Sequence, residues 1–244
     1  MIKKVILGIF AIALVASLPM GAVLAQSGKY QEGIHFFEVE QPTTLPAGSK
    51  QQLVEAFSYM CNHCNTFEPY IASWQRRMPE NVEFRRIPVV FGRQSWELYA
   101  RGYSTAEMMG VANAAHGGVM DQIWKQRKVM KTMEELADFY ADYGVEPGKF
   151  LSTSKSFAVD AKMRKDQSAV QGYGVRGTPT LILNGKYRIA GSADVPSYDD
   201  MLDVVDYLIA IETANRAAAT AADPAGDPEL GSSTGEGAAE SGGH

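Results

Sequence analysis

Cys61-Asn62-His63-Cys64 contains the only two cysteines of this chain. Thiols at positions i and i+3 can close into a small disulfide ring and reopen by thiol–disulfide exchange. A structural disulfide usually closes a long loop, because the entropy that it removes from the unfolded chain grows with loop length. A four-residue ring removes little of that entropy, so redox chemistry explains the pair better than structural stabilisation does.

The segment after Cys61 predicts a helix, which would make the two thiols unequal. Apolar residues recur there at helical spacing, at Phe67, Tyr70, Ile71, Trp74 and Met78. Free amide groups and the positive dipole end at the start of this helix would stabilise a Cys61 thiolate and lower its pKa. Cys64 lies one turn further in, away from water. We therefore expect Cys61 to exchange with partners and Cys64 to resolve.

His63 lies between the two cysteines. A protonated imidazole beside Cys61 would stabilise the thiolate and hence the reduced form of the pair. That stabilisation raises the reduction potential and makes the disulfide an oxidant. The alternative is that His63 is a solvated residue on the helix surface.

Glu55 interrupts an apolar segment at residues 53–57, six residues before Cys61. A buried carboxylate is costly unless it is paired or protonated. Glu55 is therefore a candidate proton acceptor near Cys64, with Arg86 on the neighbouring strand as a possible partner. The alternative is an edge position that faces solvent.

Gly177-Thr178-Pro179 precedes the second half of the expected sheet. Pro179 could be a cis proline beside the disulfide, with the backbone before it pairing with a bound peptide. It could equally be a loop-to-strand junction, where proline is tolerated because no N–H is needed, and only a small minority of X–Pro bonds are cis.

The other histidines, His35, His116 and His244, have no metal-ligand spacing in the sequence. A structural zinc site usually needs a second paired ligand set in addition to one Cys-x-x-Cys. We therefore expect no metal site.

The order of the expected elements predicts an α/β fold with an insertion. Strand patterns at 53–57 and 82–90 flank the helix after the motif, which makes a βαβ unit, and residues 30–39 predict an irregular first strand. Residues 95–171 show helical composition without a strand pattern. Strands at 180–183 and 186–189 follow, joined by an Asn184-Gly185 turn, and a final helix begins near Met201.

The ends of the chain differ in composition from this domain. Lys3 and Lys4, an apolar run from 5 to 18 and a small residue at Ala25 predict a cleaved signal peptide; the alternative is a membrane anchor, which needs about 20 apolar residues. We expect this signal at 1–25, the two halves of the α/β domain at 26–94 and 172–212, the helical insertion at 95–171 and a disordered tail at 213–244. The net charge of −5 argues against a nucleic-acid binder.

The chain resembles the thioredoxin superfamily and, within it, the DsbA family of periplasmic disulfide oxidoreductases. The resemblance covers residues 30–211 and includes the helical insertion, which thioredoxin itself lacks. It rests on the segments Phe57–Cys64, Phe67-Glu68, Gly177-Thr178-Pro179 and Asn184–Tyr187. It implies a thioredoxin fold in which Cys61 is the exchanging nucleophile, Cys64 its buried partner, Pro179 the cis proline and Glu55 the buried acid.

Two residues depart from the usual pattern of the DsbA family. Asn62 stands where these proteins usually have proline, and Thr178 stands where they often have valine, as in several isomerases. Both positions tune the redox potential and the choice of substrate in the family. We therefore count Asn62 and Thr178 as candidate substrate-binding residues.

The resemblance implies a monomeric periplasmic oxidoreductase that donates its Cys61–Cys64 disulfide to reduced exported polypeptides and needs no organic cofactor. A DsbB-like, quinone-linked membrane protein would then reoxidise it. The alternatives are a disulfide reductase or isomerase, and a peptide-binding chaperone with an incidental disulfide. Isomerases of this fold usually carry a dimerisation domain, for which residues 26–53 leave no room.

Overall fold

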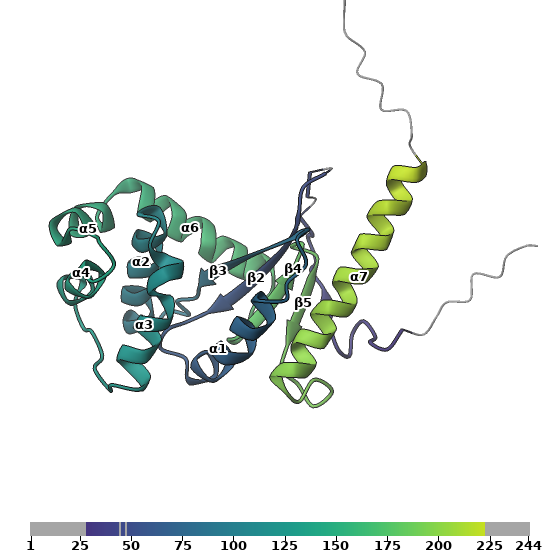
Figure 1. The fold of residues 1–244 in the computed structure, drawn as a ribbon, viewed down its shortest axis with the longest axis horizontal. Helices are drawn as coiled ribbons and strands as arrows, with labels where there is room; N and C mark the ends of the chain where they lie inside the picture. Colours follow the sequence, from purple (N-terminus) through teal and green to yellow (C-terminus); the bar gives the residue numbers. More distant parts are fainter. Residues whose placement is uncertain (1–27, 44, 47, 223–244) are drawn as a thin grey trace, which may run out of the picture.

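The computed structural model describes residues 28–43, 45–46 and 48–222 (Figure 1). The expected signal peptide and the chain after residue 222 lie outside the described residues. Among the described helices, none combines the length and apolar character that a membrane span requires.

A five-stranded mixed sheet forms the centre of the fold. Its strand order is β1 (Phe37–Glu38), β5 (Tyr187–Ala190), β4 (Thr180–Leu183), β2 (Gln51–Phe57) and β3 (Val82–Pro88). Strands β2 and β3 run parallel, and the other neighbouring pairs are antiparallel. The expected order βαβ, helical insertion, ββα is therefore confirmed.

Helices cover both faces of the sheet. On one face, α1 (Asn62–Gln75) contacts α7 (Tyr198–Ala222), and the Trp74 indole N–H donates to the Asp206 carboxylate at 2.7 Å. On the other face, α6 (Phe157–Gly172) packs through Val170 on β2 and β3. Because side chains alternate along a strand, Leu53 faces the first pair of helices and Val54 faces α6.

The insertion consists of α2 (Gln94–Met108), α3 (Ala112–Trp124), α4 (Met133–Ala141) and α5 (Pro147–Ser154), followed by α6. Figure 1 shows α2 to α5 gathered at one end of the sheet. Their apolar side chains form one buried cluster with the end of β2 and the start of α1, which includes Phe57, Tyr59, Cys61 and Cys64. The insertion therefore shares a core with the segment that carries the cysteines.

Three boundaries differ from the sequence-based expectation. The first strand is only Phe37–Glu38, because a turn occupies the residues before it. Asn184 and Gly185 both adopt positive φ as the turn requires, but the loop has three residues, since pairing closes between Leu183 and Tyr187.

The third difference concerns helix α7, which continues to Ala222 although the sequence predicts disorder from residue 213. Residues 213–222 are rich in alanine, the best helix former, and they extend a helix that is already packed on the sheet. The Thr213 hydroxyl also accepts from the Gln51 amide at 2.8 Å, and the Arg216 guanidinium donates to the Ser49 carbonyl at 2.8 Å. These contacts attach the start of the expected tail to the sheet.

The shared core predicts that the insertion and the sheet unfold together. Phe150 on α5 is fully buried and stacks on Tyr140 with ring centroids 4.8 Å apart. Its replacement by alanine should lower the free energy of unfolding by about 3–5 kcal/mol in one cooperative transition. Phe157→Ala, at a residue that is 79% exposed, is the matched control and should change it by less than about 0.5 kcal/mol. Urea denaturation followed by circular dichroism and tryptophan fluorescence measures both; two separate transitions would contradict the prediction.

Candidate active site

The two cysteines lie where β2 gives way to α1. Cys61 is the N-cap residue of α1 with an extended backbone (φ −99°, ψ 117°), so its side chain lies at the helix start, where the amide groups of the first turn have no helical partners. Its residue surface is 9% exposed, whereas Cys64 is fully buried in the first turn. Both thiols are free, so the structure describes the reduced dithiol.

Hydrogen bonds to Cys61 favour its ionised form. The Cys64 thiol supplies the largest effect, and the Thr178 side chain and the backbone amides of Cys64 and His63 add to it. Together they outweigh burial and lower the pKa of Cys61 to about 5. As a thiol, Cys61 donates to the Thr178 carbonyl at 3.3 Å, a contact that it gives up on ionisation.

Cys64 has the opposite tendency. Burial raises the pKa of its thiol far above the ordinary range, and the hydrogen bond to Cys61 and the negative charge of Glu55 raise it further. In the reduced protein Cys64 therefore keeps its proton and donates it in a hydrogen bond to the Cys61 thiolate. The two thiols thus differ in accessibility and in charge.

His63 and Asn62 are both exposed at the start of α1. The His63 imidazole lies beside Tyr198, with Nδ1 3.5 Å from the Tyr198 hydroxyl, and that hydroxyl donates to the His63 carbonyl at 3.1 Å. The His63 group that lowers the pKa of Cys61 in this geometry is the backbone amide. An electrostatic role for the imidazole stays a prediction.

The start of β4 lies against the cysteine motif although 117 residues separate Cys61 from Thr178. The Thr178–Pro179 peptide bond is cis, and Pro179 is buried. A groove of about 490 Å³ opens beside it, and its lining includes Phe37, His63, Thr178, Pro179, Tyr198 and Met201. Arg176 and Arg188 also line this groove, which gives it a basic side.

Glu55 is fully buried on β2, an interior strand between β4 and β3, so the alternative of an edge position that faces solvent is wrong. Its Oε2 accepts from Arg86 Nε at 2.8 Å, as the sequence suggested. Burial outweighs this pairing and raises the pKa of Glu55 to about 7. Its other oxygen, Oε1, is buried without a hydrogen-bond partner among the described residues.

Sequence reasoning assigned no role to two groups that join this site. Glu68 on α1 accepts from Arg86 Nη2 at 3.2 Å and hydrogen-bonds with His116 Nε2 at 2.7 Å. His116 comes from α3 in the insertion, 48 residues away from Glu68. No local sequence pattern predicts the contact between Glu68 and His116, because the sequence shows only a histidine without metal-ligand spacing at this position.

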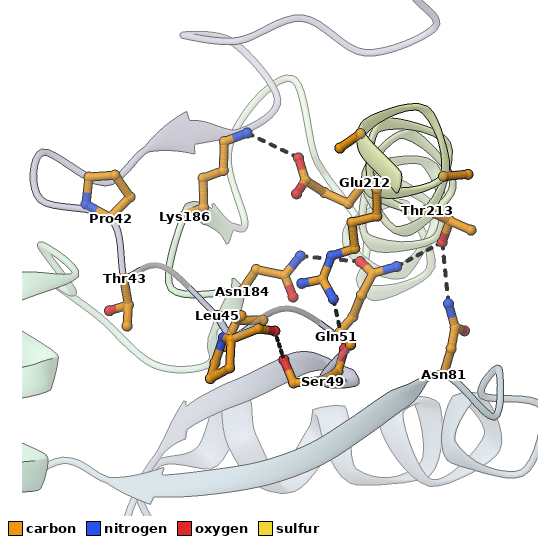
Figure 2. Close-up of a pocket in the computed structure, with 15 residues that line it drawn as sticks. Pro42, Thr43, Leu45, Ser49, Gln51, Asn81, Asn184, Lys186, Glu212 and Thr213 are labelled. Atoms are coloured by element: carbon orange, nitrogen blue, oxygen red, sulfur yellow. Dashed lines mark hydrogen bonds and ion pairs between the residues drawn. The ribbon is translucent and has the colours of Figure 1, made fainter. Parts of the chain in front are cut away.

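A second pocket, of about 620 Å³, lies at the opposite end of β2, where Gln51 begins the strand (Figure 2). Its side chains bond mainly to one another: Asn184 Nδ2 donates to Gln51 Oε1 at 3.2 Å, and Lys186 pairs with Glu212 at 3.0 Å. No cysteine lines it. Across residues 28–222, excluding 44 and 47, no cluster of three or more His, Cys, Asp or Glu side chains has a metal-binding arrangement.

The dependence of Cys61 on its neighbour can be tested by changing Cys64. Cys64→Ala removes the donor with the largest effect, so we expect the pKa of Cys61 to rise from about 5 by at least about one unit. Cys64→Ser keeps a hydroxyl donor at the same place and should leave the pKa closer to that of the reduced protein. The ultraviolet absorbance of the thiolate, titrated against pH, measures both variants. Equal values for the alanine and serine variants would contradict the assignment.

The comparisons with known proteins agree with this geometry. The family model described as a DSBA-like thioredoxin domain matches residues 52–203. The thiol:disulfide interchange protein DsbA of Pseudomonas aeruginosa PAO1 is 39% identical over 203 residues, which are 83% of this chain and 95% of the relative. The DsbA of Burkholderia cepacia is 32% identical over 80% of this chain and 93% of its own length.

Solved structures give the same result. The crystal structure of Pseudomonas aeruginosa DsbA superposes with a TM-score of 0.69 at 38% identity and covers 76% of this chain and 96% of its own. The oxidoreductase DsbA from Xylella fastidiosa superposes with a TM-score of 0.68 at 31% identity and covers 74% of this chain and 96% of its own. On the family model and on relatives that align along nearly their whole length, this chain belongs to the family of DsbA-like thioredoxin-domain proteins.

Proposed function

We propose that this protein introduces disulfide bonds into exported proteins by donating its Cys61–Cys64 disulfide. One observation carries the proposal furthest: Cys61 lies at the N-cap of α1 beside Thr178, whereas Cys64 is fully buried behind it. This arrangement lowers the pKa of Cys61 and raises that of Cys64. Stabilising a thiolate stabilises the reduced dithiol, and a pair whose reduced form is favoured takes electrons from other thiols. The names of the relatives, thiol:disulfide interchange proteins, support the same reaction.

The reaction begins with the oxidised pair. A substrate thiolate attacks Cys61 Sγ, a substrate–Cys61 disulfide forms and the Cys61–Cys64 bond breaks. Cys64 leaves with the electron pair and takes up a proton, because its buried site disfavours the anion. Glu55 is the proposed source of that proton, since it titrates near neutral pH and its charge acts on Cys64.

The second step releases the product. A second substrate thiolate attacks the substrate's own sulfur in the mixed disulfide, and Cys61 leaves as the stabilised thiolate. The substrate is then oxidised by two electrons, and the protein holds both as a dithiol. A redox partner must remove these electrons, and by resemblance we propose a DsbB-like, quinone-linked membrane protein.

The groove beside Pro179 is the proposed site for the substrate chain. Thr178 presents its carbonyl to Cys61, so a peptide that pairs with this backbone would carry its cysteine to the exposed side of the motif. His63 lines the same groove, and its neighbour Asn62 is exposed at the start of α1. We further propose that residues 1–25 direct export to the periplasm and are removed there, and that the protein acts as a monomer.

The direct test is the equilibrium redox potential against glutathione, together with oxidation of a reduced, unfolded substrate protein. We expect a potential well above that of thioredoxin, and complete loss of oxidation in Cys61→Ala. A redox potential as low as that of thioredoxin would contradict the proposed oxidase function and indicate a reductase. Retention of folding assistance by Cys61→Ala, without disulfide formation by the native protein, would indicate a chaperone.

The pKa of Cys61 also predicts how stability depends on pH. Its pKa in the folded, reduced protein is about 5, below the ordinary value of 9.0, so the ionised thiol stabilises the fold. This contribution is fully present above the unfolded pKa and is lost as the pH falls through the folded pKa. The free energy of unfolding of the reduced protein, relative to Cys61→Ser, should therefore increase between pH 5 and pH 9. Denaturation of both proteins at several pH values measures it, and a constant difference would contradict the prediction.

A further inference from the structure

Four buried or half-buried polar side chains form a continuous chain beneath the cysteine motif. Glu55 on β2 pairs with Arg86 on β3 at 2.8 Å, and Arg86 also pairs with Glu68 on α1 at 3.2 Å. His116 on α3 then hydrogen-bonds Glu68 at 2.7 Å. The chain of contacts therefore runs from the strand beside Cys64 to the helical insertion.

The charges of these four side chains do not balance if both carboxyl groups are ionised. Arg86 carries one positive charge, and its side chain is 6% exposed between two potential negative charges. A net negative charge in a buried site is costly, so near neutral pH one of the two carboxyl groups has reason to hold a proton. The surrounding donors decide which one does so.

The two carboxyl groups differ in those donors. Glu68 Oε1 interacts with both Arg86 Nη2 and His116 Nε2, and the Glu68 side chain is 19% exposed to water. Glu55 is fully buried; in the part of the chain that the structure describes, it accepts from Arg86 alone, and one of its oxygens has no partner. Negative charge is therefore better stabilised on Glu68, and a proton is better placed on Glu55.

The contacts of His116 determine the tautomer and the charge of its imidazole ring. Nε2 must carry its hydrogen to donate to the Glu68 carboxylate, so Nδ1 is free to accept from the Tyr59 hydroxyl at 3.1 Å. Burial disfavours the imidazolium and lowers the pKa of His116, and the positive charge of Arg86 lowers it further. His116 is thus a neutral donor, held in orientation from both ring nitrogens.

We propose that His116 is a positioning residue that assigns the proton to Glu55 instead of Glu68, and so keeps Glu55 as the proton donor to the Cys64 thiolate. The inference deepens the proposed function, on which the use of that proton rests. The helical insertion then contributes to the chemistry through a side chain that touches neither cysteine in the contacts described.

The direction of the carboxyl pKa values agrees with this assignment. Burial raises the pKa of Glu55 to about 7. Burial acts on Glu68 in the same direction, but the hydrogen bond to His116 and the charge of Arg86 hold the pKa of Glu68 below its ordinary value. Among the other titratable groups, Cys61 acts on Glu55, and Tyr59 and Tyr103 act on Arg86. The charge of Glu55 in turn acts on Cys64.

Three substitutions at one position separate the donor to Glu68 from the remaining contacts. The amide nitrogen of His116→Gln stands close to the place of Nε2 and can still donate to Glu68. His116→Asn is shorter, keeps a polar group near Tyr59 and loses the donor to Glu68. His116→Leu fills similar space and removes both hydrogen bonds.

The measurement is the infrared C=O stretch of a protonated carboxyl group in the reduced full-length protein, followed against pH without substrate. Glu55→Gln identifies the band, which should disappear in that variant. In the native protein the band should be lost with a midpoint near pH 7. In His116→Asn and His116→Leu the midpoint should fall by at least about one pH unit, because Glu68 then competes for the proton and Arg86 turns to Glu55. His116→Gln should restore the native midpoint.

Three results would overturn the inference: a native band that survives Glu55→Gln, a midpoint in His116→Asn equal to the native one, or a glutamine variant no closer to native than the asparagine variant. If His116→Leu fails to fold, the asparagine and glutamine pair still decides. The band is measured without substrate, so its result does not depend on the direction of the redox reaction. If the protein proved to be a reductase, the proposed function would be wrong, but the infrared result on His116 and Glu55 would still hold. A merely structural role for His116 would change stability without moving the Glu55 midpoint.

Discussion

The chemistry of the site depends on how well one sulfur atom, Cys61 Sγ, can hold a negative charge. Cys61 occupies the N-cap of α1, where amide groups without helical partners converge, and the Cys64 thiol adds the strongest donor. The helix must begin at this residue, β2 must end just before it, and β4 must bring Thr178 alongside. A helix start, a strand end and a neighbouring strand are common features of α/β folds. The lowered pKa of Cys61 therefore requires no unusual backbone geometry.

A second, buried layer of charge lies behind that sulfur. Arg86 faces two carboxyl groups, and the helical insertion closes the layer through His116. A buried ion pair contributes little to stability in general, because desolvation offsets its attraction. Its importance here is that it keeps the pKa of one carboxyl group, Glu55, near neutral pH, and that the charge of this group acts on Cys64.

The sequence predicts most of what is local. The apolar stripe from Phe67 to Met78 predicts α1, the short apolar segment at 53–57 predicts β2, and Asn184-Gly185 predicts the turn. The partner of Glu55 could also be inferred, because Arg86 follows on the next strand at the paired register position. What escapes prediction is non-local: the Glu68–His116 contact joins a helix of the domain to a helix of the insertion, and no spacing within either segment encodes it. The extent of α7 was missed for a different reason, since an alanine-rich end is typical of both a helix and a flexible tail.

The common apolar cluster has a consequence for how such proteins can be shortened. Phe57 and Tyr59, which precede the motif, contact rings from α2 and α3, and both cysteines belong to the same cluster. Deleting α2 to α5 to leave a minimal redox module would open the inner side of Cys64 to solvent and remove the hydrogen bond from the Trp124 indole to the Tyr59 carbonyl. The insertion thus closes the inner side of the reactive centre, and an ancestor without it would have needed another way to exclude water from the Cys64 sulfur.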